Sequence, residues 1–184
     1  MSGARSAVLL TGMSGAGKST ALAELRRRGH RGVDTDDPGW LEHVPRPDGG
    51  LEPLWRVDRV RALLDGHESG HLFVAGCVVN QGLLRPRFDA VVLLTAPLEV
   101  LLERLATRTT NPFGRAPAQR AAVVADVATV EPLLRRSATF VLDTRSPLAE
   151  VVDTLERVAA GQGLGPAPRH GSLSDAVGED RVNR

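Results

Sequence analysis

The 184-residue sequence predicts an α/β protein in which helices cover both faces of a parallel β-sheet. Two observations predict this class. Short apolar segments, typical of buried strands, alternate with segments whose apolar residues recur every three or four positions, typical of helices. A glycine-rich loop stands between the first such strand and the first such helix. The length suits a single domain that buries roughly 70% of its unfolded surface on folding.

The predicted elements follow one another along the chain. Strands are predicted at residues 6–10, 32–33, 71–79 (with the loop after the strand), 88–94 and 139–142. Helices are predicted at residues 18–28, 54–64, 98–105, 117–136 with a break at Pro132, and 146–158. Residues 44–53 are rich in proline and glycine and are predicted to form a loop. Residues 1–160 are therefore expected to form the domain, and residues 161–184, rich in glycine, proline, serine and charge, a disordered tail.

The balance of charge argues against some classes of partner. The chain has 23 lysine plus arginine residues and 22 aspartate plus glutamate residues, a formal net charge of +1. Proteins that bind nucleic acid or anionic membranes usually carry a larger basic excess, so neither partner is expected. The single cysteine, Cys77, allows no intramolecular disulfide, and no apolar run approaches the ~18–20 residues of a membrane span. Together with an N-terminus unlike a signal peptide, these features favour a cytoplasmic protein; they do not predict its oligomeric state.

Residues 12–19, Gly-Met-Ser-Gly-Ala-Gly-Lys-Ser, match the phosphate-binding pattern G-x-x-x-x-G-K-[ST], the P-loop. Backbone N–H groups of such a loop point at a phosphate, and the positive end of the following helix faces the same group. Lys18, the only lysine in the chain, would reach the β- and γ-phosphates, and the Ser19 hydroxyl would complete a Mg²⁺ shell. The predicted nucleotide contacts in this loop are Gly12, Met13, Ser14, Gly15, Ala16, Gly17, Lys18, Ser19 and Thr20.

Several classes of P-loop protein are excluded by what the sequence lacks. Ras-like GTPases read guanine with an N-K-x-D motif, and no lysine follows Lys18. The L-S-G-G-Q signature of ABC proteins is absent, and the length leaves no room for the helical second domain of an AAA+ motor. The small P-loop kinases remain.

The chain resembles the shikimate kinase, gluconate kinase and nucleoside monophosphate kinase group from residue 6 to about residue 160, most sharply in the P-loop. The resemblance implies a three-layer P-loop fold with strand order 2-3-1-4-5, a small lid, and ATP with Mg²⁺ as ligands. Asp34 and Asp36 resemble the D-x-D that shikimate kinases carry after the second strand. This likeness implies that Asp34 helps to hold Mg²⁺ and that Asp36 orients the acceptor hydroxyl or acts as its base. Helix-capping aspartates in a turn are the alternative.

The predicted acceptor residues come from two segments. Trp55-Arg56 resembles a Phe-Arg pair that grips the acceptor carboxylate in shikimate kinases, and Arg59 is a competing candidate. Gly76 stands where those kinases have a glycine-rich acceptor loop. The next five residues, which include Asn80 as a possible partner of a polar acceptor, contain no glycine, and this departure argues against shikimate itself. A solvated helix face is the alternative for both arginines.

The predicted lid spans residues 108–118 or thereabouts. Related kinases place arginines there that close over the phosphates and exclude water. Arg108 and Arg115 are the candidates in this chain, and Arg104 shares one helix face with Arg108. Arg145, in the loop after the fifth predicted strand, is a candidate for stacking on adenine. Solvent exposure is the alternative for Arg104, Arg108 and Arg115, and the role of Arg145 stays open.

The function predicted from the sequence is transfer of the γ-phosphate of ATP to a hydroxyl of a small metabolite. A nucleoside or nucleotide kinase would share every motif. A non-catalytic nucleotide switch also stays open, because no Walker B aspartate ends the third predicted strand. A nucleic-acid end kinase is disfavoured by the net charge of +1. The identity of the acceptor is not predicted.

Overall fold

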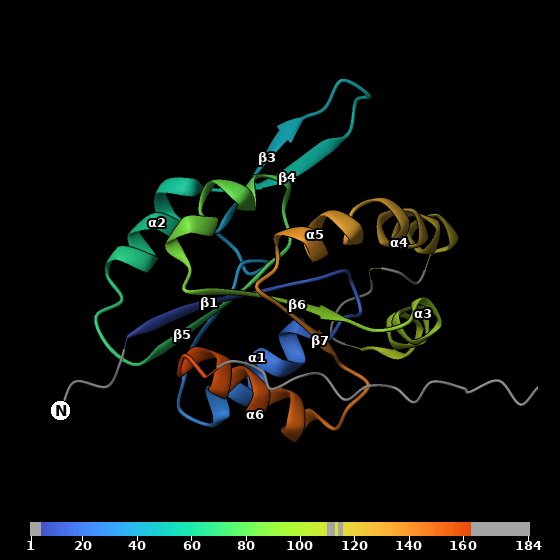
Figure 1. Cartoon of the computed structure of the whole chain (residues 1–184). Coiled ribbons are helices and arrows are strands. Elements are labelled where there is room, and N and C mark those ends of the chain that lie inside the picture. The colour runs from blue at the N-terminus through green and yellow to red at the C-terminus, as the bar shows by residue number, and fades with distance from the viewer. Residues whose placement is uncertain (1–4, 110–112, 114–115, 163–184) are drawn as a thin grey trace, which may run out of the picture.

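Five parallel strands form the sheet at the centre of the molecule (Figure 1). The computed structural model describes residues 5–109, 113 and 116–162. The strands are β1 (Ser6–Thr11), β2 (Arg31–Asp34), β5 (His71–Ala75), β6 (Ala90–Thr95) and β7 (Phe140–Asp143). They lie in the order β2-β5-β1-β6-β7, and all neighbouring pairs are parallel. Counted along the chain this order is 2-3-1-4-5, so the predicted fold class and strand order are confirmed.

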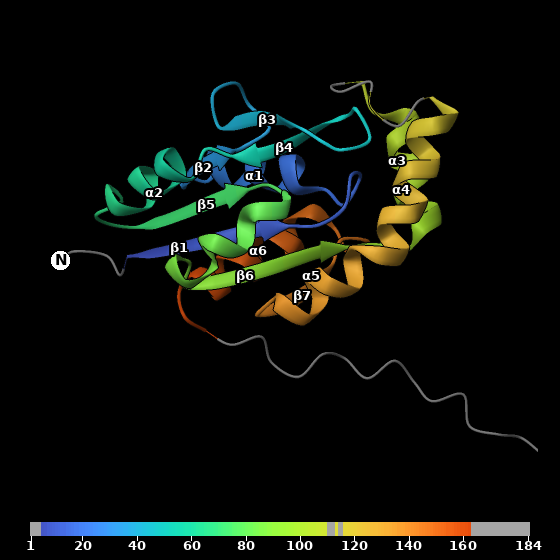
Figure 2. The same ribbon diagram turned by 90° about the horizontal axis from the view of Figure 1, so that it is seen from above.

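Helices cover both faces of this sheet and give the three layers. They are α1 (Lys18–Arg27), α2 (Val57–Asp65), α3 (Leu98–Thr107), α4 (Pro117–Thr129), α5 (Glu131–Ser137) and α6 (Leu148–Ala159). Two 3₁₀ turns, η1 (Val79–Leu83) and η2 (Arg85–Arg87), follow β5. Helices α1 and α6 lie on one face, and α2 and α5 lie on the other (Figures 1 and 2). The break predicted at Pro132 is confirmed, because a residue without an N–H is well suited to the first turn of α5.

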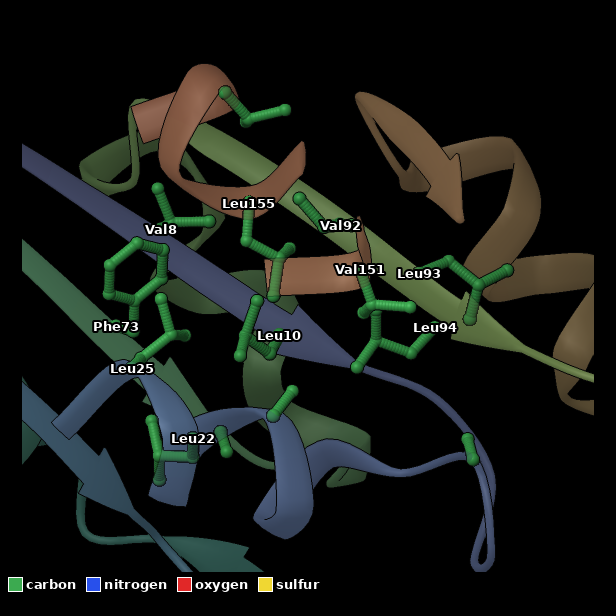
Figure 3. Packing of buried hydrophobic residues seen from close by; sticks show 14 of the residues in the cluster. Val8, Leu10, Leu22, Leu25, Phe73, Val92, Leu93, Leu94, Val151 and Leu155 are labelled. Atoms are coloured by element: carbon green, nitrogen blue, oxygen red, sulfur yellow. The ribbon is translucent and has the colours of Figure 1, made fainter. Parts of the chain in front are cut away.

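Strand β1 is buried along its whole length, so its alternate side chains belong to two apolar cores. Val8 and Leu10 face the core under α1 and α6. Figure 3 shows their neighbours there, among them Leu22, Leu25, Val151 and Leu155. Ala7 and Leu9 belong to the second core, with residues of α2. Burial on both faces explains why this strand carries a continuous apolar run rather than an alternating pattern.

A β-hairpin occupies residues 41–55, so the loop predicted at residues 44–53 is confirmed only for the turn at residues 46–50 and is wrong for the two strands. Strands β3 (Leu41–Pro45) and β4 (Leu51–Trp55) pair antiparallel and project from the sheet (Figure 1). At the tip, the Gly49 N–H donates to the Arg46 carbonyl at 3.0 Å, and Gly49 adopts a φ of +83°. This geometry is a tight turn closed by a glycine in the left-handed region, which any residue with a Cβ adopts only with strain.

Parallel pairing brings the carboxyl ends of all five central strands to one edge of the sheet. The P-loop follows β1, the Asp34–Asp36 segment follows β2, and Gly76 follows β5. Among the described residues no helix is both long and apolar enough to span a bilayer. The predicted tail lies outside the described residues from residue 163 onward, and it stays a prediction.

His71 lies at the opposite edge of the sheet, in a group of titratable side chains facing α6. Its Nδ1 lies 2.8 Å from the Ser6 hydroxyl oxygen. Its ring lies 5.6 Å from the ring of His30, whose Nε2 contacts Glu156. Burial lowers the pKa of His71, the charges of His30 and His67 lower it further, and Glu156 opposes them. Protonating His71 is therefore harder in the folded protein than in the unfolded chain.

We expect the free energy of unfolding to fall as the pH drops below about 6.5, the ordinary histidine value. In that range the unfolded chain binds a proton at residue 71 that the folded protein does not, so stability rises with pH and levels off above it. Urea unfolding at pH values from about 5 to 8 measures the slope. His71→Asn should flatten the slope, and the same change at exposed His43 should not. A slope that His71→Asn leaves unchanged would contradict the prediction.

Candidate active site

The P-loop connects β1 to α1 and is held tightly against two other elements. Gly12 and Gly15 have φ values of +145° and +84°. A Cβ on Gly12 would lie 2.3 Å from the Leu94 carbonyl oxygen, and one on Gly15 would lie 2.8 Å from the Leu101 carbonyl oxygen. The loop therefore needs glycine at both positions, for its backbone conformation and for its close approach to β6 and α3.

Lys18 begins α1 and turns its ammonium group back over the loop. Its Nζ donates to the Gly12 carbonyl at 2.6 Å and to the Met13 carbonyl at 3.2 Å. Burial lowers the pKa of Lys18, and the opposing charges of Cys77, Asp36 and Asp34 raise it. The two loop carbonyls are thus the hydrogen-bond partners of the ammonium group. The predicted contacts Gly12 and Met13 thus meet Lys18 directly.

Ser19 and Asp34, the two predicted metal ligands, are in contact. The Ser19 hydroxyl, in the first turn of α1, donates to Asp34 Oδ2 at 2.7 Å. A hydroxyl and a carboxylate oxygen are hard ligands, and Mg²⁺ bound to nucleotides typically takes one or two such groups beside phosphate oxygens and water. The pair therefore fits Mg²⁺. Within the described ranges, no group of three or more His, Cys, Asp or Glu side chains is arranged to hold a metal alone.

Asp36 lies two residues after Asp34 in the sequence and lines a cleft together with Ser19. Its backbone N–H donates to Asp34 Oδ1 at 3.1 Å, which closes a tight turn at the end of β2. Burial of the carboxyl raises the pKa of Asp36, as do the neighbouring carboxylates of Asp34 and Asp37. Lys18 and Arg108 act in the opposite direction. Asp36 therefore holds a proton more readily than an ordinary aspartate, which suits a group that accepts one.

A cleft of about 840 Å³ joins the P-loop to these groups. This volume is in the usual range for a site that binds a small molecule. The cleft is lined by Asp36, which follows β2, and by Pro53 of the hairpin. Lys18 and the loop between β7 and α6 also line it. Its further lining residues are Ser14, Gly15, Gly17, Ser19, Thr20, Ala21, Arg104, Thr107, Arg108, Phe113, Thr144, Arg145, Ser146, Leu148 and Val151.

Arg104 connects the two sides of the nucleotide end of the cleft. One guanidinium nitrogen donates to the Thr144 hydroxyl at 2.8 Å and to the Gly15 carbonyl at 3.3 Å. The other terminal nitrogen donates to the Thr144 carbonyl at 2.7 Å. Arg104 thus joins the P-loop to the β7–α6 loop rather than standing free as a lid residue. Sequence reasoning missed this role, because nothing local marks Thr144 as its partner.

Two of the other arginines predicted near the nucleotide, Arg108 and Arg145, line the described cleft. Arg108 donates to the Phe113 carbonyl at 2.7 Å, and its charge acts on both Lys18 and Asp36. Arg145 lines the cleft and forms a two-pronged pair with Asp143, with contacts from 2.6 to 3.1 Å. Arg115 and the centre of the predicted lid lie outside the described residues.

Four predicted acceptor residues are placed away from the described cleft lining. Arg56 donates to the Leu41 carbonyl at 3.3 Å. Arg59 donates to the Gly39 carbonyl at 2.9 Å, with its guanidinium 5.2 Å from the centre of the Trp40 ring. Both arginines are exposed. The other two, Gly76 and Asn80, contact the buried Trp55. The role of all four residues as acceptor ligands stays a prediction.

Replacing Gly15 by alanine should weaken ATP binding by more than about tenfold. The new Cβ would collide with the Leu101 carbonyl oxygen, and the loop would have to move away from phosphate-binding geometry. Gly29→Ala is the matched control, because Gly29 has a similar φ of +93° but no atom within 4 Å of the added Cβ. It should cost some stability and leave the affinity unchanged. Calorimetric titration with ATP and Mg²⁺ measures the ATP affinity of each variant. Equal affinities in Gly15→Ala and Gly29→Ala would contradict the prediction.

Comparison with known proteins gives the family. A family model described as AAA domain matches residues 8–124, which contain the P-loop, the Asp34–Asp36 segment and α3. No curated protein is significantly similar in sequence.

Solved structures share the fold at low sequence identity. A shikimate kinase from Acinetobacter baumannii in complex with shikimate is 18% identical with a TM-score of 0.55, covering 83% of this chain and 92% of its own. A shikimate kinase from Bacteroides thetaiotaomicron is 16% identical with a TM-score of 0.55, covering 83% and 97%. A sugar kinase from Janibacter sp. is 20% identical with a TM-score of 0.52, covering 86% and 95%. The resemblance to small P-loop kinases is thereby confirmed for the fold. Because the family match spans more than half of the chain, the protein belongs to the AAA domain family.

Proposed function

We propose that the protein is an ATP-dependent kinase that transfers the γ-phosphate to a hydroxyl of a small metabolite. One observation carries the proposal: the P-loop lysine, Lys18, and the Asp36 carboxylate line the same cleft. Phosphoryl transfer needs a nucleophile in line with the γ-phosphate and cations around it. The acceptor hydroxyl would be the nucleophile, Asp36 would orient it, and Lys18 with bound Mg²⁺ would supply the cations.

At the nucleotide end, the P-loop backbone N–H groups and Lys18 would hold the phosphates. Lys18 would exchange its bonds to the Gly12 and Met13 carbonyls for phosphate oxygens. Ser19 and Asp34 would hold Mg²⁺, which supplies positive charge to the β- and γ-phosphates when bound. Arg145 would stack on adenine at the far end of the cleft.

At the acceptor end, Asp36 would orient the acceptor hydroxyl and take its proton. The acceptor oxygen forms a bond to the γ-phosphorus while the bond to the β,γ-bridging oxygen breaks, and ADP leaves. A raised carboxyl pKa makes Asp36 a better proton acceptor than an ordinary aspartate. Lys18, Arg108 and, in the predicted lid, Arg115 would neutralise the charge that develops on the transferred group.

The acceptor we propose is a hydroxylated small molecule such as a sugar or sugar acid. The structural neighbours named as shikimate and sugar kinases support this class. The acceptor end between Asp36 and Pro53 belongs to a cleft of small-molecule size. A nucleoside or nucleotide acceptor is the second substrate class to test, because it would use the same P-loop and cleft.

The testing experiment is a transfer assay with Mg²⁺·ATP and a pooled set of sugars, sugar acids and nucleosides, read by mass spectrometry for phosphorylated products. Lys18→Ala and Asp36→Asn are the control variants. A product made by the wild type and lost in both variants would support the proposal and name the acceptor. A product that Asp36→Asn leaves unchanged would overturn the base role alone. ATP binding that depends on Lys18 without any product would favour a nucleotide switch.

A further inference from the structure

Trp55 is the largest fully buried side chain among the described residues, and it also carries a polar contact. It ends strand β4, and its indole Nε1–H donates to the Thr35 hydroxyl at 2.9 Å. The ring packs 6.4 Å from that of Phe88. A phenylalanine at this position would fill most of the same space but would have no hydrogen to donate. The tryptophan therefore adds one directed bond to an apolar core.

Thr35 stands between the two carboxylates of the site and points away from them. It has no exposed surface, and both its backbone N–H and its hydroxyl donate to the Ala75 carbonyl, at 2.9 and 2.8 Å. Asp34 ends β2, and the chain then turns, with the Asp37 N–H donating to the Asp34 carbonyl at 3.2 Å. Thr35 is the residue of this turn that is anchored inside the protein, while Asp34 contacts Ser19 and Asp36 lines the cleft.

The contact between Trp55 and Thr35 is held from two further sides. The side-chain amide of Asn80 pairs with the Trp55 backbone, accepting from its N–H at 2.9 Å and donating to its carbonyl at 3.0 Å. Gly76 lies beneath, where a Cβ would come within 2.2 Å of the Thr35 hydroxyl oxygen and 3.1 Å of the indole ring. Four separate segments therefore converge on one hydrogen bond between buried groups.

We propose that Trp55 is a positioning residue that acts through Thr35 to aim the Asp34 and Asp36 carboxylates. It thereby joins the hairpin that lines the acceptor end of the cleft to the carboxylates of phosphoryl transfer. This inference rests on the proposed kinase function. Asn80 supports it by fixing the Trp55 backbone, and Gly76 supports it by leaving room for the bond.

Two variants remove the hydrogen bond between Trp55 and Thr35, and a third variant keeps it. Trp55→Phe loses the donor, Thr35→Val loses the hydroxyl, and Thr35→Ser keeps it. With the acceptor found in the transfer assay, kcat should fall about 10- to 100-fold in the first two, as expected for a carboxylate displaced by up to 1 Å. KM for ATP should stay within about twofold, and Thr35→Ser should keep most of the wild-type kcat. A change confined to kcat separates aiming of the carboxylates from loss of nucleotide binding.

A matched control separates positioning from mere loss of stability. Phe73→Leu removes volume from a fully buried side chain in β5, in the core under α1 and away from Trp55. It should lower the free energy of unfolding at least as much as Trp55→Phe and leave kcat within about twofold. The proposal is overturned if folded Trp55→Phe keeps the wild-type kcat, or if Phe73→Leu loses as much kcat as Trp55→Phe.

An NMR measurement keeps the inference testable without any kinase activity. In Trp55→Phe, the backbone ¹⁵N–¹H resonances of Thr35, Asp36 and Asp37 should shift, and the Thr35 amide should exchange faster, while Phe73→Leu leaves them in place. If the wild type transfers no phosphate but these resonances respond, the proposed function fails and the positioning contact stands. If they do not respond to Trp55→Phe, the positioning role is overturned, whatever the activity.

Discussion

Replacing Asp36 by asparagine is expected to make the protein more stable and nearly inactive at the same time. Burial and the neighbouring Asp34 carboxylate raise the pKa of Asp36, so the folded protein holds this proton more tightly than the unfolded chain. Ionising Asp36 therefore costs stability, increasingly as the pH rises above about 3.9, and the whole cost is present at neutral pH. Asparagine has nearly the same shape and no charge, so it removes that cost.

The loss of activity has a separate cause. An amide cannot take the proton of the acceptor hydroxyl, and removing a general base typically lowers turnover by about 10²–10⁴-fold. Differential scanning calorimetry at pH 7 should show a higher Tm for Asp36→Asn than for the wild type, and the difference should shrink toward acid pH. Wild-type turnover in Asp36→Asn, or a lower Tm, would contradict the prediction.

Asp37→Asn is the matched control for this pair of effects. Asp37 is adjacent and, like Asp36, exposed, but unlike Asp36 it is not among the described residues that line the cleft. The substitution removes the same charge one residue away and should leave turnover near the wild-type value. A Tm that rises in Asp36→Asn, together with a turnover lost only there, is the signature of a carboxylate kept at a functional position against its cost in stability.

The central sheet was predictable because its three inner strands, β1, β5 and β6, are buried almost along their whole length. Continuous apolar runs such as 6–10 and 88–94 allow few readings besides a strand, and the glycine-rich loop fixes which run comes first. The strand order came from the resemblance rather than from periodicity. The hairpin was missed because its strands carry Pro45, Pro53 and two glutamates, Glu42 and Glu52, which weaken any strand pattern. The signal that would have found it is Pro47-Asp48-Gly49, a turn sequence with a known mechanism.

The proximity of Ser19 and Asp34 follows from the predicted topology, whereas the contacts of Asn80 do not. Ser19 and Asp34 meet because the carboxyl ends of parallel strands lie at one edge, a consequence of topology alone. The sequence predicts Asn80 as a possible hydrogen-bond partner of a polar acceptor, and that role stays a prediction. In the structure its amide is used by the Trp55 backbone, and this contact exists only because the hairpin returns to η1. Long-range pairing of this kind leaves no trace in local sequence.

Because Lys18 is the only lysine, an amine-acylating reagent tests the phosphate site without any substitution. Only the deprotonated amine reacts, and burial lowers the pKa of Lys18, so a larger share of this amine is reactive near neutral pH than of an exposed lysine. Mg²⁺·ATP should protect it: at about 100 times Kd, acylation should slow on the order of 100-fold. Mass spectrometry of peptides reads the modified fraction over time.

The α-amino group of the chain serves as the internal control, because it reacts in the same sample and should be indifferent to ATP. Protein acylated at Lys18 should lose ATP affinity as strongly as Lys18→Ala, since both lack the ammonium group that phosphate oxygens would take over from the Gly12 and Met13 carbonyls. A lysine that only fills a glycine turn would be acylated equally with and without ATP, and its acylation would leave nucleotide binding intact. Protection at Lys18 alone would instead place the triphosphate over the ammonium group, where the proposed transfer requires it.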